Sequence, residues 1–230
     1  ELINSFGFSR QYVKNLIYNP FEGQLDTGKM MHSLVALAGA NDIRLFTGTE
    51  VSNLEESTNV KVSTKSGNSR ISFSANRVIV CTNAFTKALI PESDLSPGRG
   101  IVLVTQPISK LKIQGAFHME QGYYYFRNFN DRVIFGGGRN LYLEEESNTT
   151  FEINQKIYNV LLNKLKHEIL PSTDFDVDMT WAGIMAFGQT KQPLVTWHSE
   201  NVLLGARLGG MGVAIGSKVG EQLAEMATKD

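Results

Sequence analysis

The feature that most constrains the fold is a strand, a glycine-rich turn and a helix in succession, LLGARLGGMGVAIGSKVGEQLAEM, over Leu203–Met226. Gly210, Gly212 and Gly216 give the spacing G-x-G-x-x-x-G, one residue longer than the dinucleotide-binding fingerprint. That fingerprint belongs to a βαβ unit, which needs a second strand after the helix. The sequence stops at Asp230. We therefore expect the turn to serve a sheet whose other strands come from earlier in the chain.

The order of the predicted elements indicates an interrupted domain. Residues 27–90 contain a predicted helix and a buried strand, RVIVC. Residues 91–200 contain antiparallel strands and an amphipathic helix over 153–170, and residues 201–230 return to a buried strand and a helix. This order predicts a mixed α+β and α/β chain. Its first and last blocks share one sheet around an inserted antiparallel-sheet domain.

Turn residues and hydrophobic periodicity give the finer expectations. Hairpins are predicted around Ser66–Asn68 and Asn128–Asp131. A strand is predicted over 42–56 and the last helix over 217–228. Pro, Ser, Asp and Gly gather over 91–100, which predicts a linker.

Composition excludes several classes of function. Twenty-two basic and 23 acidic residues give a net charge of -1, which argues against a nucleic-acid partner. No run of 18 apolar residues occurs, so we expect no membrane span. The single cysteine, Cys81, fits a reducing compartment, and we expect a cytoplasmic location. The run Glu144–Glu146 is interpreted as a solvated charged surface.

Metal chemistry is not expected either. The histidines share no metal-ligand spacing and are interpreted as structural or exposed: His32, His118, His167 and His198.

Five stretches in the right order resemble one family. They are ANRVIVCTNAF (75–85), RGIVLVTQPI (99–108), GYYYFRNFNDRVIFGGGRN (122–140), MTWAGIMAFGQTKQPLV (179–195) and the terminal glycine-rich turn. The set, spread over residues 22–230, is similar to the D-amino-acid-oxidase-like family of FAD-dependent oxidoreductases. The resemblance is greatest to amine and gamma-glutamylputrescine oxidase-like members.

The resemblance implies two domains. Residues 22–90 and 201–230 correspond to the remaining part of an FAD-binding domain, and residues 1–21 and 91–200 to a substrate-binding domain. In the family, a glycine-rich fingerprint at the extreme N-terminus binds the FAD pyrophosphate, and this sequence has none. We therefore expect the chain to be a fragment of a longer protein that binds FAD poorly or not at all by itself.

The same resemblance implies a set of cofactor contacts. The closing turn supplies flavin contacts, Val51 after the strand IRLFTGTE touches the adenine end, and the residues after RVIV border the cofactor. These residues are Gly209, Gly210, Met211, Gly212, Val213, Val51, Cys81, Thr82 and Asn83. From the residues alone, glycines before a helix are more often just a tight turn, and Cys81 at a strand end is more often a small buried side chain.

The resemblance also implies substrate contacts. Tyr123 and Tyr125 are expected to share one side of a strand, with Arg127 as a substrate or loop anchor. Amino-acid-oxidising relatives often place a carboxylate-binding Arg where Met185 follows WAGI, and this sequence also lacks their T-D-P aspartate. Both departures favour a small-molecule amine or longer amino compound over an α-amino acid. Arg207 is either a source of the missing charge or a structural or surface residue.

The implied reaction is oxidation of a C–N bond by hydride transfer to the flavin of FAD, with no single catalytic base evident. Two alternatives stay open. An enzyme using NAD or a methyl donor predicts an acidic residue about 20 residues after the turn, on a second strand. A catalytically inert substrate or interaction domain predicts a chain that folds without FAD. Oligomeric state is not assigned.

Overall fold

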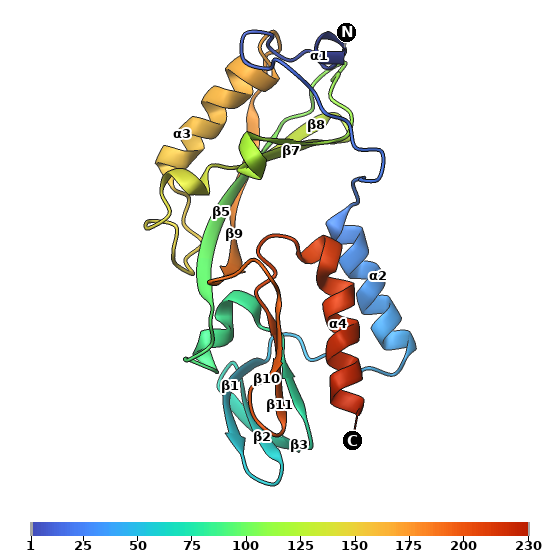
Figure 1. Ribbon diagram of the computed structural model, residues 1–230, viewed down its shortest axis with the longest axis vertical. Coiled ribbons are helices and arrows are strands. Elements are labelled where there is room, and N and C mark those ends of the chain that lie inside the picture. The colour runs from blue at the N-terminus through green and yellow to red at the C-terminus, as the bar shows by residue number, and fades with distance from the viewer. Residues whose placement is uncertain (1, 230) are drawn as a thin grey trace. The chain divides into compact units, whose positions relative to one another are not determined.

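Two sets of residues pack as separate units in the computed structural model, which describes residues 2–229 (Figure 1). Unit 1 consists of the residues up to Gln24 together with Gly98–Ile184. Unit 2 consists of Leu25–Pro97 and the residues from Met185 onward. None of the helices in the described part of the chain has the length and apolar character needed to cross a lipid bilayer.

Unit 1 is built on an antiparallel sheet with the strand order β6-β7-β8-β5-β9. The strands are β5 (Ser96–Thr105), β6 (Ala116–Met119), β7 (Tyr124–Phe129), β8 (Arg132–Gly137) and β9 (Val177–Phe187). The last residue pair of β7 and β8 is Phe129 and Arg132, so the chain turns through Asn130 and Asp131. The pairs β6–β7, β7–β8 and β5–β8 are all antiparallel. The predicted hairpin and the antiparallel character of this region are confirmed. The predicted linker is shorter, because β5 already begins at Ser96.

One helix covers this sheet. Helix α3 (Gln155–Lys164) begins after Asn154, whose side chain accepts a hydrogen bond from the backbone of Lys156 at 3.0 Å. Its apolar stripe places Ile157 and Leu161 in a core with Phe135 of β8. The chain continues through a π-helical turn, Leu165–Ile169, so the predicted helix over 153–170 is confirmed in all but its end turns. A short helix, α1 (Leu2–Phe6), precedes the sheet.

A buried ion pair anchors the loop between β8 and α3. Glu146 is fully buried, and both its carboxylate oxygens accept hydrogen bonds of 2.8 Å from Arg99. Asn154 donates another at 2.7 Å, and Arg99 also donates to Thr150. Desolvation acts to raise the pKa of Glu146, but these hydrogen bonds and the Arg99 charge outweigh it and lower the pKa. The interpretation of Glu144–Glu146 as solvated is therefore wrong for Glu146, because a run of like charges does not show which member has a buried partner.

Unit 2 contains two small sheets. The first is an antiparallel meander of β1 (Glu50–Glu56), β2 (Val60–Ser66) and β3 (Ser69–Ala75), which confirms the hairpin predicted around Ser66–Asn68. The second has the order β10-β11-β4, from β4 (Val78–Val80), β10 (Leu194–Trp197) and β11 (Val202–Ala206).

Strands from distant parts of the sequence meet in the second sheet. Strand β11 runs parallel to β4, with Val202 opposite Val78, so the first and last blocks do share one sheet. Strand β10 pairs antiparallel with β11. Residues 194–197, which the sequence grouped with the inserted block, therefore belong to this sheet.

The two helices of unit 2 differ in their packing. Helix α4 (Gly212–Thr228) begins five residues earlier than predicted and packs Val219 and Leu223 against Leu203 of β11. Helix α2 (Thr27–Ala40) is capped by Asp26 as its sequence favours, but none of its residues is buried.

The strand predicted over 42–56 begins only at Glu50. Ile43, Leu45 and Phe46 are exposed and lie outside any strand among the described residues. An apolar segment becomes a strand only when another strand completes its hydrogen bonds.

Candidate functional site

The carboxyl ends of two parallel strands bring most of the predicted cofactor residues together. Val80 at the end of β4 lies opposite Leu204 of β11. Cys81–Asn83 follow β4, and the turn Arg207–Met211 follows β11 and leads into α4. Because the strands are parallel, both segments leave the sheet at the same edge, which is where open α/β sheets bind ligands.

The glycine-rich turn has a backbone that requires glycine. Gly209 and Gly210 have φ of 56° and 85°, in the left-handed region that residues with a Cβ avoid. The backbone N–H of Gly209 donates to Ala186 at 3.0 Å, and that of Met211 to Leu208 at 2.8 Å. Helix α4 then starts without a side-chain cap, and its first N–H groups have no acceptor within the helix. The turn is exposed, so these donors can approach a ligand.

Arg207 fixes the start of this turn. It is buried and has a φ of 61°, although it is not a glycine. Its Nε donates to the carbonyl of Gln192 at 2.8 Å, and its Nη1 pairs with the Asp94 carboxylate. A Cβ on Gly188 would lie 2.4 Å from the Arg207 Cδ, so glycine leaves room for the side chain. The guanidinium is thus tied to two loops, and the surface alternative for Arg207 is wrong; Asp94 was not foreseen.

The end of β4 has a second left-handed position. Asn83 has a φ of 46°, and its amide oxygen Oδ1 is buried without a hydrogen-bond partner among residues 2–229. Its neighbour Thr82 shares a hydroxyl–hydroxyl hydrogen bond of 3.0 Å with Thr86. A buried acceptor that lacks a donor indicates a place for an external donor.

Cys81 is exposed, contrary to the expectation of a small buried side chain. A Cβ on Gly205 would lie 3.3 Å from its sulfur, so the thiol still packs against β11. Desolvation raises the pKa of Cys81, which keeps the thiol protonated at neutral pH and lowers its reactivity.

Met185 lies beside the glycine turn. A Cβ on Gly210 would be 3.4 Å from the Met185 sulfur, and the backbone of the next residue, Ala186, accepts the hydrogen bond from Gly209. Met185 is half-buried. The structure therefore places this predicted substrate residue against the predicted flavin turn.

Val51 lies elsewhere in unit 2. It is inside β1 rather than after a strand, pairs with Thr64, and precedes a β-bulge before Asn53. The difference follows from the late start of β1 at Glu50.

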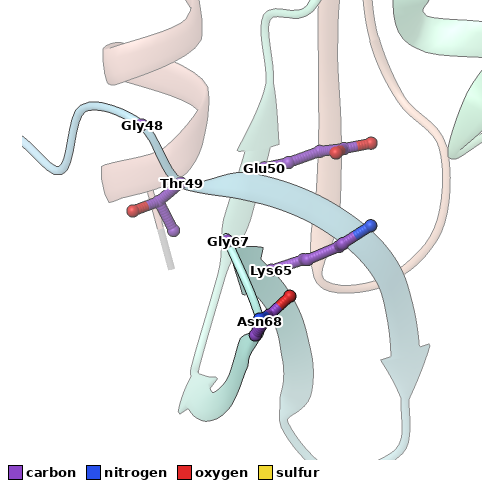
Figure 2. Close-up of a pocket in the computed structure, with 6 residues that line it drawn as sticks. All are labelled: Gly48, Thr49, Glu50, Lys65, Gly67 and Asn68. Carbon is purple, nitrogen blue, oxygen red and sulfur yellow. The ribbon is translucent and has the colours of Figure 1, made fainter.

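An open groove of about 650 Å³ lies next to Val51, and Glu50, the residue before it, is one of the lining residues. It lies between the start of β1 and the β2–β3 turn and is lined by Gly48, Thr49, Glu50, Lys65, Gly67 and Asn68 (Figure 2). Figure 2 shows Glu50 and Lys65 extending the same way from neighbouring strands. Its lining carries both charges and no large apolar side chain, so it is unlike the mostly apolar sites that enclose small substrates.

The other predicted substrate residues lie in unit 1. Tyr123 is 50% exposed but precedes β7, at the end of a 3₁₀ turn over Glu120–Gly122, so the predicted strand alternation with Tyr125 is wrong. The ring of Tyr125 packs over Gly136, where a Cβ would lie 2.9 Å from it, and desolvation raises the pKa of Tyr125. Arg127 is half-buried, with its guanidinium 5.9 Å from the Phe129 ring.

Arg139 is a candidate functional residue that the sequence did not lead us to expect. It is half-buried in the 3₁₀ turn Arg139–Leu141 after β8. Desolvation lowers the pKa of Arg139, and the nearby Glu146 and Tyr123 partly offset this. The sequence signal that could have indicated Arg139 is the run Gly136–Gly138 just before it, because glycines allow a ligand or another chain segment to approach the backbone closely. Within residues 2–229, no group of three or more His, Cys, Asp and Glu side chains is arranged to hold a metal ion.

The sequence pattern of the family described as FAD dependent oxidoreductase (DAO) matches residues 4–226. The chain belongs to this family. Membership of this family agrees with the fold described above, in which the turn after β4 and the turn after β11 leave the carboxyl ends of two parallel strands. A comparison with curated proteins gives no match.

Solved structures share the fold of this DAO-family chain. L-proline dehydrogenase from P. horikoshii superposes with a TM-score of 0.75 at 20% identity over 91% of the chain. Glycine oxidase from Geobacillus kaustophilus gives 0.74 at 17% identity over 91%. NikD, described as an unusual amino acid oxidase, gives 0.75 at 18% identity over 100%. The chain covers 57%, 56% and 63% of those chains, less than two thirds of each.

Proposed function

We propose that this chain is part of an FAD-dependent oxidoreductase that oxidises a C–N bond of an amine or amino compound. The observation that supports it best is that the left-handed Asn83, after β4, and the left-handed turn Gly209–Gly210, after β11, follow the carboxyl ends of two parallel strands. The glycine turn leads into the uncapped start of α4.

The residues present fit the ring end of a flavin. The glycine turn is exposed at Gly209 and Gly210, which have left-handed backbones and no Cβ, and it is followed by uncapped N–H donors. Asn83 offers a buried acceptor without a partner among the described residues. The residues proposed to hold the group are Thr82, Asn83 and Gly209–Val213, with Cys81 at the border and Val51 toward the adenine. When bound, FAD supplies the hydride acceptor.

The protein's own contribution is electrostatic and steric. The N-terminus of α4 carries partial positive charge, which stabilises negative charge that develops next to it during the reaction. The ion pair of Arg207 with Asp94 holds the preceding turn, so these donors need little reorganisation. Such preorganised donors act most strongly where water is excluded.

Met185 favours an uncharged contact with substrate. A thioether next to the glycine turn offers no partner for a carboxylate, whereas it packs against an alkyl chain. An apolar environment also lowers the pKa of a bound amine, so its neutral form, which hydride removal requires, becomes more populated. We therefore propose an amine or longer amino compound as substrate.

The FAD-binding part of unit 2 is proposed to be incomplete in this chain. Helix α2 and residues 43–46 carry exposed apolar side chains, which an adjoining strand and helix would cover. The chain alone is then expected to lack flavin. An inert interaction domain is the alternative function, and it predicts that the longer protein lacks flavin too.

The test is spectroscopic. The full-length protein is purified, its absorbance near 450 nm is recorded, and it is mixed without oxygen with a set of amines and their α-amino-acid counterparts. We expect bound flavin that amines bleach faster than α-amino acids do; the 230-residue chain is the colourless control. Full-length protein without flavin after incubation with FAD would overturn the proposal. Faster bleaching by α-amino acids would overturn its substrate class alone.

A further inference from the structure

Strand β3 (Ser69–Ala75) is an edge strand of the meander in unit 2. It pairs with β2 on one side, and its other side has no partner strand among residues 2–229. Its pairs with β2 run without a register shift, so the free edge is regular. Unpaired backbone N–H and C=O groups along such an edge form a template for another strand.

The opposite edge of the same meander, β1 (Glu50–Glu56), has features that prevent such pairing. A β-bulge interrupts its register between Val51 and Asn53, and three of its seven residues are glutamates. Strand β3, SRISFSA, has no bulge, no proline and a single charge, that of Arg70. Because proteins commonly blunt free edges with bulges, charges and prolines, β3 lacks the protection that β1 has.

Two exposed apolar side chains lie on one face of β3. Ile71 is 63% exposed and Phe73 is 53% exposed, and they alternate with polar residues. The β2 residues opposite them, Thr64 and Val62, are buried. This face of the meander is therefore covered at β2 and open at β3, where one more strand would cover it.

The turn between β2 and β3 decides which backbone groups point outward. Ser66 and Ser69 flank a two-residue turn, and hydrogen-bonded pairs alternate with non-hydrogen-bonded pairs from there along the ladder. The 3.2 Å separation of the Ser63 and Ser72 hydroxyl oxygens fits a non-hydrogen-bonded pair, in which side chains lie closer. In this alternation, the residues whose N–H and C=O groups point to the free edge are Arg70, Ser72 and Ser74.

A second copy of β3 fits this edge in a symmetric register. Antiparallel pairing about Ser72 sets the two Ser72 residues opposite each other and uses the outward N–H and C=O groups of both strands. Each Ile71 then lies opposite Phe73 of the second copy, so the exposed apolar side chains cover each other. Each Arg70 lies opposite Ser74 of the second copy, so no like charges meet.

Other symmetric registers are less favourable. Pairing centred on Arg70 would set two guanidinium groups opposite each other. Pairing centred on Ile71 or Phe73 would face backbone groups that β2 already uses. Pairing centred on Ser74 would leave Ile71 beyond the last residue of the second strand.

We propose that β3 is a dimerisation edge, at which two copies of this chain join their three-stranded meanders into one continuous sheet with the two-fold axis at Ser72. The bulged, acidic β1 strands form both outer edges of that sheet and stop its further growth. The proposal uses residues of unit 2 alone and is independent of the function proposed above.

The test uses the position of Ser72 on the two-fold axis. Sedimentation velocity of the full-length protein and of the 230-residue chain should show a monomer–dimer equilibrium. Ser72→Asp and Ser72→Lys each set like charges directly opposite each other, so each should raise the dimer dissociation constant about fivefold. An equimolar mixture of the two variants should recover the dimer, because an aspartate then faces a lysine.

Ser74→Asp is the matched control, because it adds the same charge to the same face two residues away. In the proposed register it lies opposite Arg70 of the second copy, so it should lower the dissociation constant about fivefold. Both serines are exposed, so the circular dichroism and the melting temperature of the monomer should stay close to those of wild type.

Four results would overturn the proposal. The first is a monomer at every concentration in both proteins, and the second is growth beyond the dimer, which would mean open-ended pairing. The third is an equal response to Ser72→Asp and Ser74→Asp, which would show charge repulsion without this register. The fourth is a dimer of the 230-residue chain that the full-length protein lacks, because other residues of the longer protein would then cover β3.

Discussion

Units 1 and 2 differ in how far their own residues bury each other. Fourteen buried residues of unit 1 form one continuous core, which α3 and the sheet share. In unit 2, the cluster between β11 and α4 has three buried members, Leu203, Val219 and Leu223. Helix α2 has none, and its Leu34, Val35 and Leu37 are about half exposed.

The difference shows what local sequence can and cannot provide. Both α2 and α3 have a side-chain cap at the first turn, so their starts are set locally. Most of the stability of a helix comes from packing its apolar face, and only α3 has a face to pack against within the described residues. Helix α3 is therefore covered by its own unit, whereas helix α2 leaves its apolar side chains exposed.

The largest effect is expected from equal truncations on these two helices. Leu161→Ala on α3 removes a fully buried side chain and should lower the free energy of unfolding by about 2–5 kcal/mol. Leu34→Ala on α2, where the side chain is 49% exposed, should change it by less than about 0.5 kcal/mol. Urea denaturation of the purified chain measures both. Equal losses would show that α2 is packed in solution and would remove the contrast.

Removing an ion pair should also lower the free energy of unfolding more in unit 1 than in unit 2. Glu146→Gln leaves Arg99 buried without its counter-charge and should cost about 3 kcal/mol at pH 7. Asp94→Asn in unit 2 should cost about 1 kcal/mol, since Asp94 is 43% exposed and water can replace it. Chemical denaturation at pH 7 gives both values.

Acidic pH should remove the difference in stability between wild type and Glu146→Gln. Because the folded-state pKa of Glu146 is lowered, its contribution is complete above the unfolded-state pKa near 4.5 and is lost as the pH falls through the folded value. Wild type and Glu146→Gln should therefore converge below pH 4.5 in unfolding titrations. A gap that stays constant down to pH 3 would mean that the carboxylate charge is not what stabilises the loop.

Two glycines of the G-x-G-x-x-x-G turn should respond with opposite signs. Gly210→Ala forces a Cβ onto a φ of 85° and should destabilise by about 1–2 kcal/mol. Gly216→Ala lies inside α4 with no atom within 4 Å of the new Cβ and should stabilise by about 1 kcal/mol. Thermal melts of the two variants suffice as the measurement. If both destabilise, α4 has contacts beyond those of the described chain.

A further expected effect concerns substrate choice. In the full-length protein, Met185→Arg should raise the ratio of kcat/KM for an α-amino acid over its decarboxylated amine about tenfold, or ~1.4 kcal/mol, because a carboxylate gains a bidentate partner. Met179→Arg, at a 57% exposed position of the same strand β9, is the control. If the ratio does not rise, Met185 does not contact the substrate and only packs against Gly210.

Sequence patterns predicted elements well where neighbours in the chain decide the structure. The hairpin turns at Gly67 and Asn130, the amphipathic helix α3 and the strand–turn–helix from Leu203 follow from turn chemistry and periodicity. The sharing of one sheet by β4 and β11 followed from element order and the short connections it implies.

Properties that depend on distant partners were not predictable. The burial of Glu146 depends on Arg99, which is far along the chain, and the tie of Arg207 depends on Asp94. The left-handed turn at Glu120 gave no signal, since neither Glu nor Gln favours that backbone. Of the candidate site, the sequence indicated which turns to examine. It did not indicate that Met185 would contact one of them.

The pairing of β4 with β11 has a consequence for synthesis on the ribosome. Val78 must wait for Val202, and at about 5–20 residues per second that delay is roughly 6–25 s. Within that interval the strands β5 to β8 have all emerged and can pair with one another. The nascent chain therefore carries β4 without its partner strand during this interval, whereas the hairpins of the inserted sheet can form as they are synthesised.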